Sequence, residues 1–508
     1  MTNIALNGKM KKMKASLKKK ISLAGLIVVL ATVMIHAQEN VRLLTLPDAI
    51  EIAREQSPDG LMAKHRFRSS FWQFRSYQAS YLPSLELGAT MPNFNRSIQR
   101  ISVAEGEILS TRRYSEYSLN AYVRQRIGPT GGQVFLRSGL ERLDNFNDSA
   151  TISQYLSTPI NIGYSQPLFQ FNEFKWEKKL EPMRYNEAKR KYLEDMEQVS
   201  IMATNHFFNL LLSQIKEKIA LINQANYDTL YKIAQGRFEL GKIAENDLLQ
   251  LELQYLRASA QVEEARIDVE NKLFRLKSYL RIQDEIPIEL IPPADIRPFE
   301  VEFTKALEQA RLNRSEALSF ERRLLEAEQE VNQARMDGRF DAELYAVYGL
   351  TQSAPEIENV YVDPLDQQQL TLGLNIPILD WGVARGRIKM ARSNQELVRT
   401  SIEQEQIDFD QEIFLKVAQF NMQYDQVVIS AKADTVARKS YDISKQRYLI
   451  GKISITDLNI ARAEADNSRS SYINALWTYW SNYYEIRKLT LYDFQRNQKI
   501  DIDHTSLL

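Results

Sequence analysis

The 508-residue sequence contains no cysteine, which excludes disulfide bonds, thiolate metal sites and a lipid-anchored N-terminal cysteine. Glycine and proline are scarce, at 18 and 15 residues, so a disordered or linker-rich chain is not expected. Neither sign of charge dominates, because 65 basic residues balance 65 acidic ones. No polybasic region indicates binding to nucleic acid. The length exceeds that of one ordinary compact core, so we expect more than one structural part.

Long apolar runs are also missing, apart from one near the N-terminus. Seven lysines between Lys9 and Lys20 precede an apolar stretch over 21–35, and Ala37 is a small residue at a plausible cleavage point. This order predicts a secretory signal peptide over residues 1–37. The alternative is an uncleaved membrane anchor, although the stretch is shorter than the ~20 residues of a spanning helix. A secreted chain of this kind is expected in the periplasm or in the outer membrane, whose barrel strands escape hydropathy analysis.

Two parts of the chain repeat each other. Residues 237–243 read Arg-Phe-Glu-Leu-Gly-Lys-Ile, and residues 447–453 read Arg-Tyr-Leu-Ile-Gly-Lys-Ile, at an offset of 210. Nearer the N-terminus the offset is 257, so the first part carries about 47 extra residues. We therefore predict two structural repeats, over 38–300 and 301–493, followed by a C-terminal tail over 494–508.

Each predicted repeat has the same order of elements: a helix, strands, a very long helix, a glycine turn and a returning helix. In the first repeat these are a helix over 46–81, strands within 83–168, a long helix over 173–237 and a return helix over 244–283. In the second they are a helix over 302–337, strands within 339–379, a long helix over 383–448 and a return helix over 454–489. Apolar residues spaced by three and four predict coiled-coil packing of the long helices. A helix of about 65 residues spans about 98 Å.

The strand segments alternate apolar and polar residues. Leu85, Leu87 and Ala89 alternate with Glu86 and Gly88, and five further segments follow the same rule. The pattern fits either a barrel wall in lipid or a half-buried sheet of a soluble domain. Three features favour the wall. Arginines on the polar side suit a wet lumen: Arg124, Arg126 and Arg137. Aromatic residues at the strand-to-helix junctions suit an interfacial belt: Phe169, Phe171, Phe174, Trp176 and Trp381.

The third feature is the length of the predicted loops. Segments 95–114, 145–157 and 351–367 are long and polar, whereas the turn over 128–132 is short, as in outer-membrane barrels. Six strands cannot close such a barrel alone, and an open sheet edge in lipid leaves backbone groups unpaired. The chain is therefore expected to share a barrel with copies of itself.

The order of these motifs resembles the TolC-like outer-membrane efflux family. The resemblance is carried by the opening Leu46-Pro47-Asp48-Ala49-Ile50, the junctions around Pro83, Pro167 and Pro377, and the turns at Gly241 and Gly451. It implies a mixed α and β fold with two internal structural repeats per chain. It further implies a trimeric outer-membrane β-barrel continued by a long periplasmic α-helical coiled-coil barrel. Such a trimer would have eighteen barrel strands, or twelve if the hairpin over 115–145 folds outside the wall.

The same resemblance implies function and partners. It describes an exit duct of a tripartite efflux or type I secretion system, working as a homotrimer with a periplasmic adaptor protein and an inner-membrane transporter. It places a periplasmic gate at Asp247, Tyr448 and Asp457, and adaptor-contacting tips at Gly241, Lys242, Gly451 and Lys452. The sequence departs from the family at Ile453 and Ile460, where a basic and an acidic gate residue can occur. For Asp247 and Asp457 the alternative is a charge favoured at a helix N-terminus.

No catalytic residue, metal site or cofactor is predicted. The four histidines are scattered, and the glycine-rich segment over 128–133 lacks the lysine of a phosphate loop. The aromatic residues between Trp477 and Tyr484 are expected to pack between helices. We therefore expect a passive channel and not an enzyme. The alternative is a soluble periplasmic coiled-coil scaffold. The sequence does not identify the transported substrate.

Overall fold

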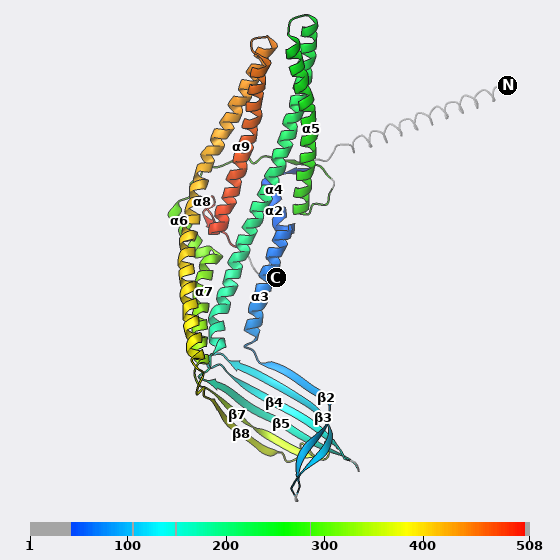
Figure 1. The fold of residues 1–508 in the computed structure, drawn as a ribbon, viewed down its shortest axis with the longest axis vertical. Coiled ribbons are helices and arrows are strands. Elements are labelled where there is room, and N and C mark those ends of the chain that lie inside the picture. The colour runs from blue at the N-terminus through cyan, green and yellow to red at the C-terminus, as the bar shows by residue number, and fades with distance from the viewer. Residues whose placement is uncertain (1–41, 104–105, 148–149, 285, 503–508) are drawn as a thin grey trace, which may run out of the picture. The chain divides into compact units, whose positions relative to one another are not determined.

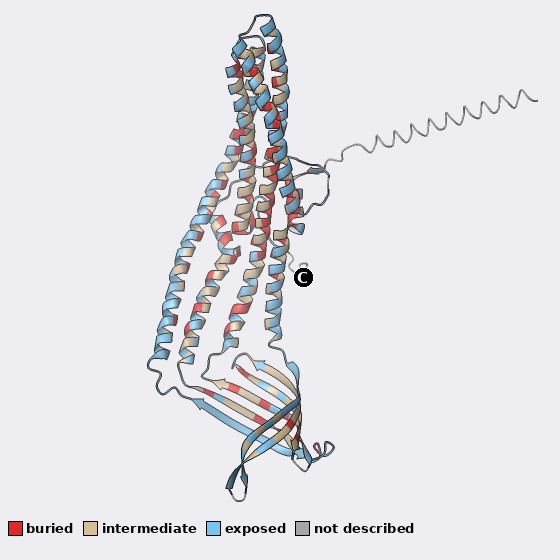
Figure 2. Ribbon diagram, turned by 45° about the vertical axis from the view of Figure 1, so that its right-hand side comes forward, coloured by how far each residue is buried: buried red, intermediate tan, exposed pale blue. Residues whose placement is uncertain are grey.

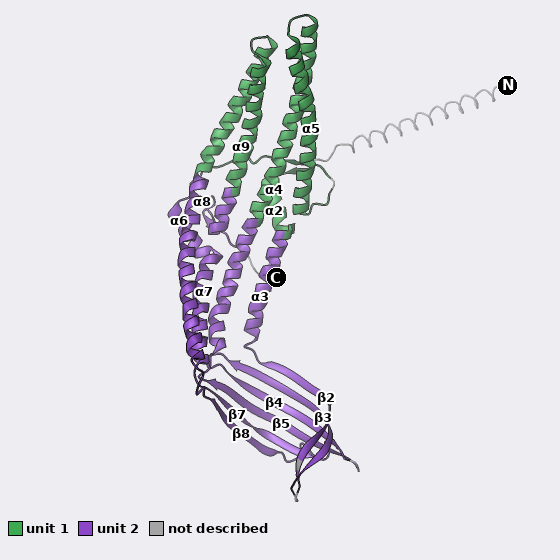
Figure 3. Cartoon of the chain, viewed as in Figure 1, with its two compact units in different colours: residues 1–58, 199–298, 422–481 green, residues 59–198, 299–421, 482–508 purple. Residues whose placement is uncertain are grey.

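The computed structural model describes residues 42–103, 106–147, 150–284 and 286–502, and the predicted signal peptide lies outside them. The chain divides into two compact units (Figure 3). Unit 1 contains residues 1–58, 199–298 and 422–481, and unit 2 contains residues 59–198, 299–421 and 482–508. Among the described residues, no helix has both the length and the apolar character needed to cross a membrane.

Unit 1 holds the ends of two long helical hairpins. In one, α4 (Glu173–Glu239) turns into α5 (Glu245–Leu280), and in the other, α8 (Val383–Leu449) turns into α9 (Ile455–Thr490). Their apolar stripes meet in a core that includes Tyr227 and Leu230 of α4, Leu251 of α5 and Leu458 of α9. The hairpins are therefore held together mainly by burial of these side chains. A short parallel pair, β1 (Arg42–Leu44) with β6 (Ile288–Leu290), and α2 (Leu46–Gln56) complete the unit.

Unit 2 carries a six-stranded antiparallel sheet in the order β2-β3-β4-β5-β7-β8 (Figure 1). The strands are β2 (Ser84–Val103), β3 (Gly106–Ile127), β4 (Gly132–Phe146), β5 (Thr151–Leu168), β7 (Asp341–Ala354) and β8 (Leu365–Asn375). Each of the two outer strands, β2 and β8, has one neighbour in the sheet. The described chain therefore forms six sheet strands, as the alternation predicts, and the sheet stays open.

The predicted loop over 95–114 is wrong. Residues 93–103 of β2 pair with residues 106–116 of β3, so the segment is an antiparallel ribbon. The two other predicted loops are also shorter than expected, because β4 ends at Phe146, β5 starts at Thr151, and β7 ends at Ala354. The polar composition of these segments led to the wrong prediction that they are loops. A ribbon with both faces uncovered by the rest of the sheet needs no apolar side, and its Thr, Ile, Tyr and Arg residues still favour extended backbone.

The two predicted opening helices are each divided in the structure. The helix expected over 46–81 becomes α2 and α3 (Pro58–Ala79), because Ser57 is extended and the residue before proline avoids helical angles. The helix expected over 302–337 becomes α6 (Phe303–Asn313) and α7 (Ser315–Asp337). There the backbone N–H and hydroxyl of Ser315 both donate to the Glu194 carboxylate of α4, at 2.7 and 2.9 Å. The carboxylate caps the start of α7.

Residues 494–502 do not trail freely from the helices, although the sequence predicted a tail over 494–508. A small antiparallel pair joins β9 (Tyr492–Asp493) to β10 (Gln498–Lys499) within unit 2. Arg487 of α9 is anchored beneath it by Glu197 and Asp493, whose side chains are 1% and 3% exposed. The end of the described chain is thereby tied to α4.

Candidate functional site

The sheet has an apolar face and a polar face, assigned by the strand register. Each row of paired residues puts its side chains on the same side, so Leu85, Val123, Leu136 and Ile162 are neighbours across four strands. We call this side the apolar face; on the outermost strand, β8, it carries Leu370, Leu372 and Leu374. In the described strands the one charged residue on it between the helical end of the sheet and Arg142 of β4 is Asp366, near the far end of β8.

On this sheet the side chains of the apolar face are more exposed than those of the other face, whereas a soluble domain buries its apolar face. On β4, the apolar Val134 and Leu136 are exposed, while Phe135 and Arg137 on the other side are half-buried. Figure 2 shows that much of the sheet is exposed or only partly buried. At the sheet edges Leu87 is 71% exposed and Leu370 is 77% exposed. A soluble protein rarely leaves so continuous an apolar surface uncovered. The finding is unlike the half-buried sheet of a soluble domain.

The polar face gathers arginine and tyrosine on β2 to β4. The Arg124 and Arg137 guanidinium carbons lie 4.7 and 5.6 Å from the centre of the Tyr122 ring. Arg124 also contacts Glu86 of the neighbouring strand, and Arg137 donates to Asn120 Oδ1 at 3.0 Å. These cations are held by ring faces and polar partners, which suits a wet surface better than a dry core. Two of the three predicted lumen arginines thus belong to one cluster.

The predicted aromatic belt is only partly formed. Phe169 and Trp381, at the helical end of the sheet, are 60% and 88% exposed. Both have the exposure that an interfacial residue needs. Trp176, by contrast, is 7% exposed and belongs to the interior of the unit, so its assignment to the belt is wrong. Phe174 packs edge-on against Tyr81, with ring centres 6.1 Å apart.

Both hairpin tips end in the same hydrogen-bonded turn. Lys242 N–H donates to the Arg237 carbonyl at 2.8 Å, and Lys452 N–H donates to the Arg447 carbonyl at 2.9 Å. Gly241 and Gly451 have φ of +67° and +73°, the left-handed region that favours glycine in such caps. A large apolar side chain is exposed immediately before each glycine: Leu240 is 70% and Ile450 is 66% exposed. The structure therefore presents two similar tips.

Two of the three predicted gate residues come together in unit 1. Asp247 and Tyr448 line one cavity of about 520 Å³, next to Arg237 and Lys242. Burial raises the pKa of the Tyr448 hydroxyl above its usual value, so the group stays protonated and available as a donor. Arg237 donates from Nη2 to the Leu449 carbonyl at 2.5 Å. This contact ties the end of α4 to the end of α8.

Asp457, the third predicted gate residue, does not line this cavity. Its carboxylate accepts from the Ser454 hydroxyl at 2.7 Å and from the Ser454 N–H at 3.1 Å, while its own N–H donates back to that hydroxyl. These bonds to Ser454 hold the pKa of the carboxyl below its usual range. The arrangement is a capping box at the start of α9, the alternative that the sequence left open for this residue.

The sequence analysis missed Arg237. It sought a basic gate residue after the second tip glycine and found Ile453, whereas the structure supplies a guanidinium from the end of α4. One signal was available. Arg237 and Arg447 occupy the same place in the two repeated segments, at 237–243 and 447–453.

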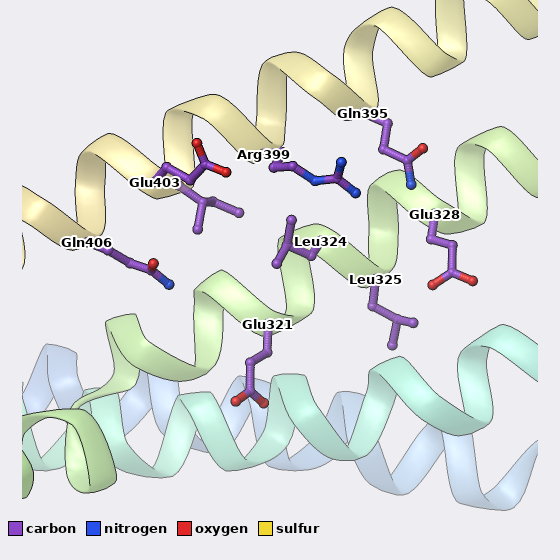
Figure 4. A pocket seen from close by; sticks show the side chains of 9 residues that line it. Glu321, Leu324, Leu325, Glu328, Gln395, Arg399, Glu403 and Gln406 are labelled. Carbon is purple, nitrogen blue, oxygen red and sulfur yellow. The ribbon is translucent and has the colours of Figure 1, made fainter.

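A further cavity, of about 590 Å³, is an open groove of unit 2 between α7 and α8. Figure 4 shows Leu324 and Leu325 of α7 at its wall and Arg399 and Glu403 of α8 across from them. Arg399 is already paired with Glu396 at 3.1 Å. Within the described part of the chain, no cluster of three or more His, Asp or Glu side chains is arranged to hold a metal ion.

Comparison with solved structures shows the same fold in several outer-membrane channels. The Campylobacter jejuni CmeC outer membrane channel matches with a TM-score of 0.63 at 16% identity, over 91% of this chain and 88% of that chain. The outer membrane protein VceC of Vibrio cholerae matches with a TM-score of 0.61 at 13% identity, over 90% and 97%. The open state of the Neisseria gonorrhoeae MtrE outer membrane channel matches with a TM-score of 0.61 at 14% identity, over 90% and 91%.

Comparison with curated proteins found no match. Comparison with protein families found one that covers most of the chain, described as outer membrane efflux protein, over residues 49–280 and 306–490. The TolC-like resemblance drawn from the junctions and glycine turns is thereby confirmed. The chain belongs to the outer membrane efflux protein family.

Proposed function

We propose that the chain is one subunit of a homotrimeric exit channel in the outer membrane. It conducts substrates passively from an inner-membrane transporter and a periplasmic adaptor to the outside, in a tripartite efflux or type I secretion system. The protein carries out no bond chemistry, because its task is to enclose a water-filled path. The alternative, a soluble periplasmic scaffold, provides no role for a sheet with an uncovered apolar side.

One observation carries this proposal: the apolar face of the six-stranded sheet is exposed and continuous, and from the helical end it is free of charge up to Asp366 near the far end of β8. Lipid satisfies such a face, but it cannot satisfy the backbone groups of an open edge. The free edges of β2 and β8 therefore need partner strands inside the membrane. Copies of the same chain supply them if β2 of one subunit pairs with β8 of the next, which gives an eighteen-stranded barrel for three subunits.

The wall must also have two different ends. The helices join the sheet at the end that holds Phe169 and Trp381, and the connection between β7 (ending at Ala354) and β8 (starting at Leu365), longer than the turn between Ile127 and Gly132, lies at the opposite end. In this proposal the helical end faces the periplasm, and the end with the longer connection faces the outside. The long helices of three subunits then pack side by side into the predicted coiled-coil barrel, and the two repeats supply equivalent hairpins to it. The helix breaks at Ser57 and Arg314 have the repeat offset of 257, which supports this equivalence.

The hairpin tips are the proposed gate and the proposed contact with the adaptor. The gate consists of Asp247 and Tyr448 with Arg237, whose bond to Leu449 holds the tips of the two hairpins together. Asp457 contributes through the capped start of α9. The adaptor would meet the tip turns at Gly241, Lys242, Gly451 and Lys452, where the exposed Leu240 and Ile450 offer apolar contact.

The test uses the natural absence of cysteine. Cysteine pairs are introduced at the apolar positions of the two edge strands, combining Leu85 or Leu87 of β2 with Leu372 or Leu374 of β8. After membrane fractionation, at least one pair is expected to give covalently linked trimers on oxidation, because neighbouring edges lie within disulfide reach. A pair on β4 alone, at Val134 and Leu140, is the control and should give no linked species.

The fractionation separates the proposal from the scaffold. A barrel stays with the membrane until detergent is added, and particle images of the extracted protein should show three copies and eighteen wall strands. A properly folded monomer that washes off in buffer would contradict the channel. A trimer with twelve wall strands would contradict only the proposed strand count.

A further inference from the structure

The outward sides of α5 and α8 in unit 1 carry regularly spaced apolar residues. In Figure 3, α9 and α4 lie between these two helices. On α5 the exposed residues follow one another at steps of three, four or seven positions: Leu249, Leu253, Leu256, Ala260, Ile267 and Phe274. On α8 they are exposed at every seventh position: Met422, Ile429, Val436 and Ile443. We call these sets the α5 stripe and the α8 stripe.

Both stripes lie on the sides of their helices that face away from the core of unit 1. Leu251 of α5 is buried in that core, whereas Leu249, two positions earlier, is 54% exposed. Tyr441 of α8 packs against the same core, whereas Ile443, two positions later, is 50% exposed. Two positions correspond to about 200° around a helix, so the residues that contact the core and the exposed ones lie on nearly opposite sides. The stripes can therefore pack against a further helix.

The spacing and the length of the stripes indicate what that further element is. Apolar residues that recur every seven positions are typical of a helix that packs along a second helix. The α8 stripe covers residues 422–443, which corresponds to about 33 Å along the helix axis. An uncovered apolar surface of this length is unusual in a folded protein. The occupant is therefore expected to be another long helix.

The tips of the two hairpins lie near one level. Arg237, four positions before Gly241, donates a hydrogen bond to the carbonyl of Leu449, two positions before Gly451. A threefold axis carries one subunit onto the next without changing its height along the axis. Residues of α5 and α8 at equal distances from the glycines of their own tips therefore have about the same height in neighbouring subunits.

This rule brings the apolar residues of the two stripes together. Leu249 and Ile443 are both eight positions from the glycine of their own tip. Leu256 and Val436 are both fifteen positions away. The α5 helix runs away from its tip and α8 runs toward its own, so the two helices would pack as an antiparallel pair. The same chain thus carries two different stripes that match each other in spacing and in height.

Charged residues within and beside the stripes have opposite signs at matching heights. Lys432 of α8 is nineteen positions from its tip glycine, and Glu263 of α5 is twenty-two positions from its own. Asp425 of α8 is twenty-six positions away, and Arg266 of α5 is twenty-five. Glu263 and Arg266 are 3.5 Å apart, and more than half of each side chain is exposed. Complementary charges along a helix pair set its partner and its register.

We propose that the α5 stripe of one subunit packs against the α8 stripe of the next, as an antiparallel pair in register from the tips. This inference rests on the proposed function, because it needs the homotrimer. Since the two stripes differ, each subunit uses each of them once, and the contact closes a ring of three. A second copy of the chain is therefore the occupant. An adaptor at the tip turns would leave Ile429 and Met422 uncovered, more than twenty positions from Gly451.

The test joins the stripes covalently in the full-length protein, which has no cysteine of its own. Leu249→Cys is combined with Ile443→Cys in one variant, and Leu256→Cys with Val436→Cys in another. At least one of these pairs should give linked trimers on oxidation in isolated membranes, because the residues meet within disulfide reach. Leu249→Cys with Val436→Cys is the matched control. This pair is displaced by seven positions, or about 10 Å, and should not link.

The outcomes separate this inference from the channel itself. The edge-strand cysteine pairs of β2 and β8 are oxidised in parallel. Linked trimers from the edge strands, without linkage of either matched helix pair, would overturn the helix contact alone. Failure of the edge-strand pairs and the helix pairs together would instead count against the proposed function. Linkage of the displaced pair to the same extent, or disulfides formed only within one chain, would also overturn the assigned contact.

A charge exchange tests the register by a second measurement. Glu263→Lys places a cation near Lys432 of the next subunit, so the yield of linked trimers in the Leu256 and Val436 cysteine variant should fall about tenfold. Adding Lys432→Glu to the same chain restores opposite charges and should restore the yield. Restoration would support the contact between different chains. A yield that stays low in the double exchange, or that never falls with Glu263→Lys, would contradict the pairing of Glu263 with Lys432.

Discussion

Arg237, near the end of α4, donates a hydrogen bond from Nη2 to the carbonyl oxygen of Leu449, near the end of α8, at 2.5 Å. The bond connects the two hairpins of unit 1 immediately before their tip turns. It also places a guanidinium beside Tyr448 and Asp247, which line the same cavity. An interaction between a charged donor and a neutral acceptor contributes about 1.5–3 kcal/mol. Three copies in a trimer would make this contact a substantial part of the force that keeps the tips together.

The first prediction concerns this bond. Arg237→Ala should raise the single-channel conductance in planar bilayers, because each subunit loses one link between its hairpins. A loss of about 1.5–3 kcal/mol per link shifts the balance toward the wider state by about tenfold or more. Arg447→Ala is the control, since Arg447 occupies the same position in the second repeated segment but has an exposed side chain. Unchanged conductance in Arg237→Ala, or an equal rise in Arg447→Ala, would refute a gating role for the bond.

The second prediction concerns the buried ion pairs of unit 2. Arg487 donates from Nε and Nη2 to the Glu197 carboxylate at 3.0 Å each, and from Nη1 to Asp493 at 2.7 Å. Arg487→Met removes a shared cation from two buried carboxylates, so we expect a loss of about 3–5 kcal/mol of stability. The measurement is thermal or denaturant unfolding followed by helical circular dichroism.

The matched control for this prediction is Arg399→Met. Arg399 pairs with Glu396 on the surface of α8, where both side chains are more than half exposed. Such exposed pairs contribute at most about 1 kcal/mol. Equal losses of stability in the two variants would show that the buried ion pairs of Arg487 stabilise the fold no more than an exposed pair does.

The elements of this fold were readable from the sequence wherever one periodic pattern decided them. Apolar residues at helical spacing marked α4 and α8, and alternation marked the sheet strands that carry Leu85, Leu136 and Leu372. Such patterns indicate burial on one side of an element. They can therefore be recognised without knowing which elements pack against it. The capping box of Ser454 and Asp457 is equally local, but the sequence analysis predicted only a charge at a helix N-terminus as the alternative for Asp457.

What the sequence concealed depends on contacts between distant segments. The break between α6 and α7 is capped by Glu194, more than a hundred residues away, and nothing near Ser315 announces it. The gate contact of Arg237 ends on a backbone carbonyl, which every residue possesses. The ribbon of residues 94–113 was mistaken for a loop because its polar residues alternate with no buried side. In each case the deciding partner lies outside the local pattern.

The third prediction concerns a glycine in the wall. A Cβ on Gly349 of β7 would lie 2.3 Å from the Ile160 carbonyl oxygen and 2.0 Å from Asn161 Oδ1. Gly349→Ala should therefore force β5 and β7 apart where they pair at the register shift, with a loss of at least about 1–3 kcal/mol. The expected result is a lower yield of heat-resistant trimers on electrophoresis.

Gly373→Ala is the control for this variant. The nearest atom to a Cβ at Gly373 is the Glu343 carbonyl oxygen at 3.9 Å, an ordinary contact distance. Trimer yield should match the parent protein. If Gly349→Ala assembled equally well, the close approach of β5 to β7 would not be required for the wall.

The fourth prediction concerns pH and a half-buried carboxyl on α9. Asp466 accepts a hydrogen bond from Asn223 Nδ2 at 2.9 Å and lies in a cavity with Lys216 of α4 and Asp268 of α5. Burial raises the pKa of the Asp466 carboxyl, against the opposing effects of Asn223 and the nearby Arg462. The unfolded chain releases this proton first as pH rises from about 3.9, so the folded state loses stability through that window. The penalty is fully present at neutral pH.

Asp466→Asn should remove this penalty, because an amide keeps an oxygen that can accept from Asn223 and carries no charge. Thermal unfolding measured from acidic to neutral pH should show a flatter dependence and a higher midpoint at neutral pH than in the parent protein. Asp457→Asn is a control in which the pH dependence of stability is expected to change in the opposite direction. Its bonds to Ser454 lower the pKa of that carboxyl, so the parent gains stability above the unfolded pKa and loses it as pH falls through the folded one. A destabilised Asp466→Asn protein at neutral pH would show that the carboxylate is needed as an ion, and the assigned effect of burial would then be wrong.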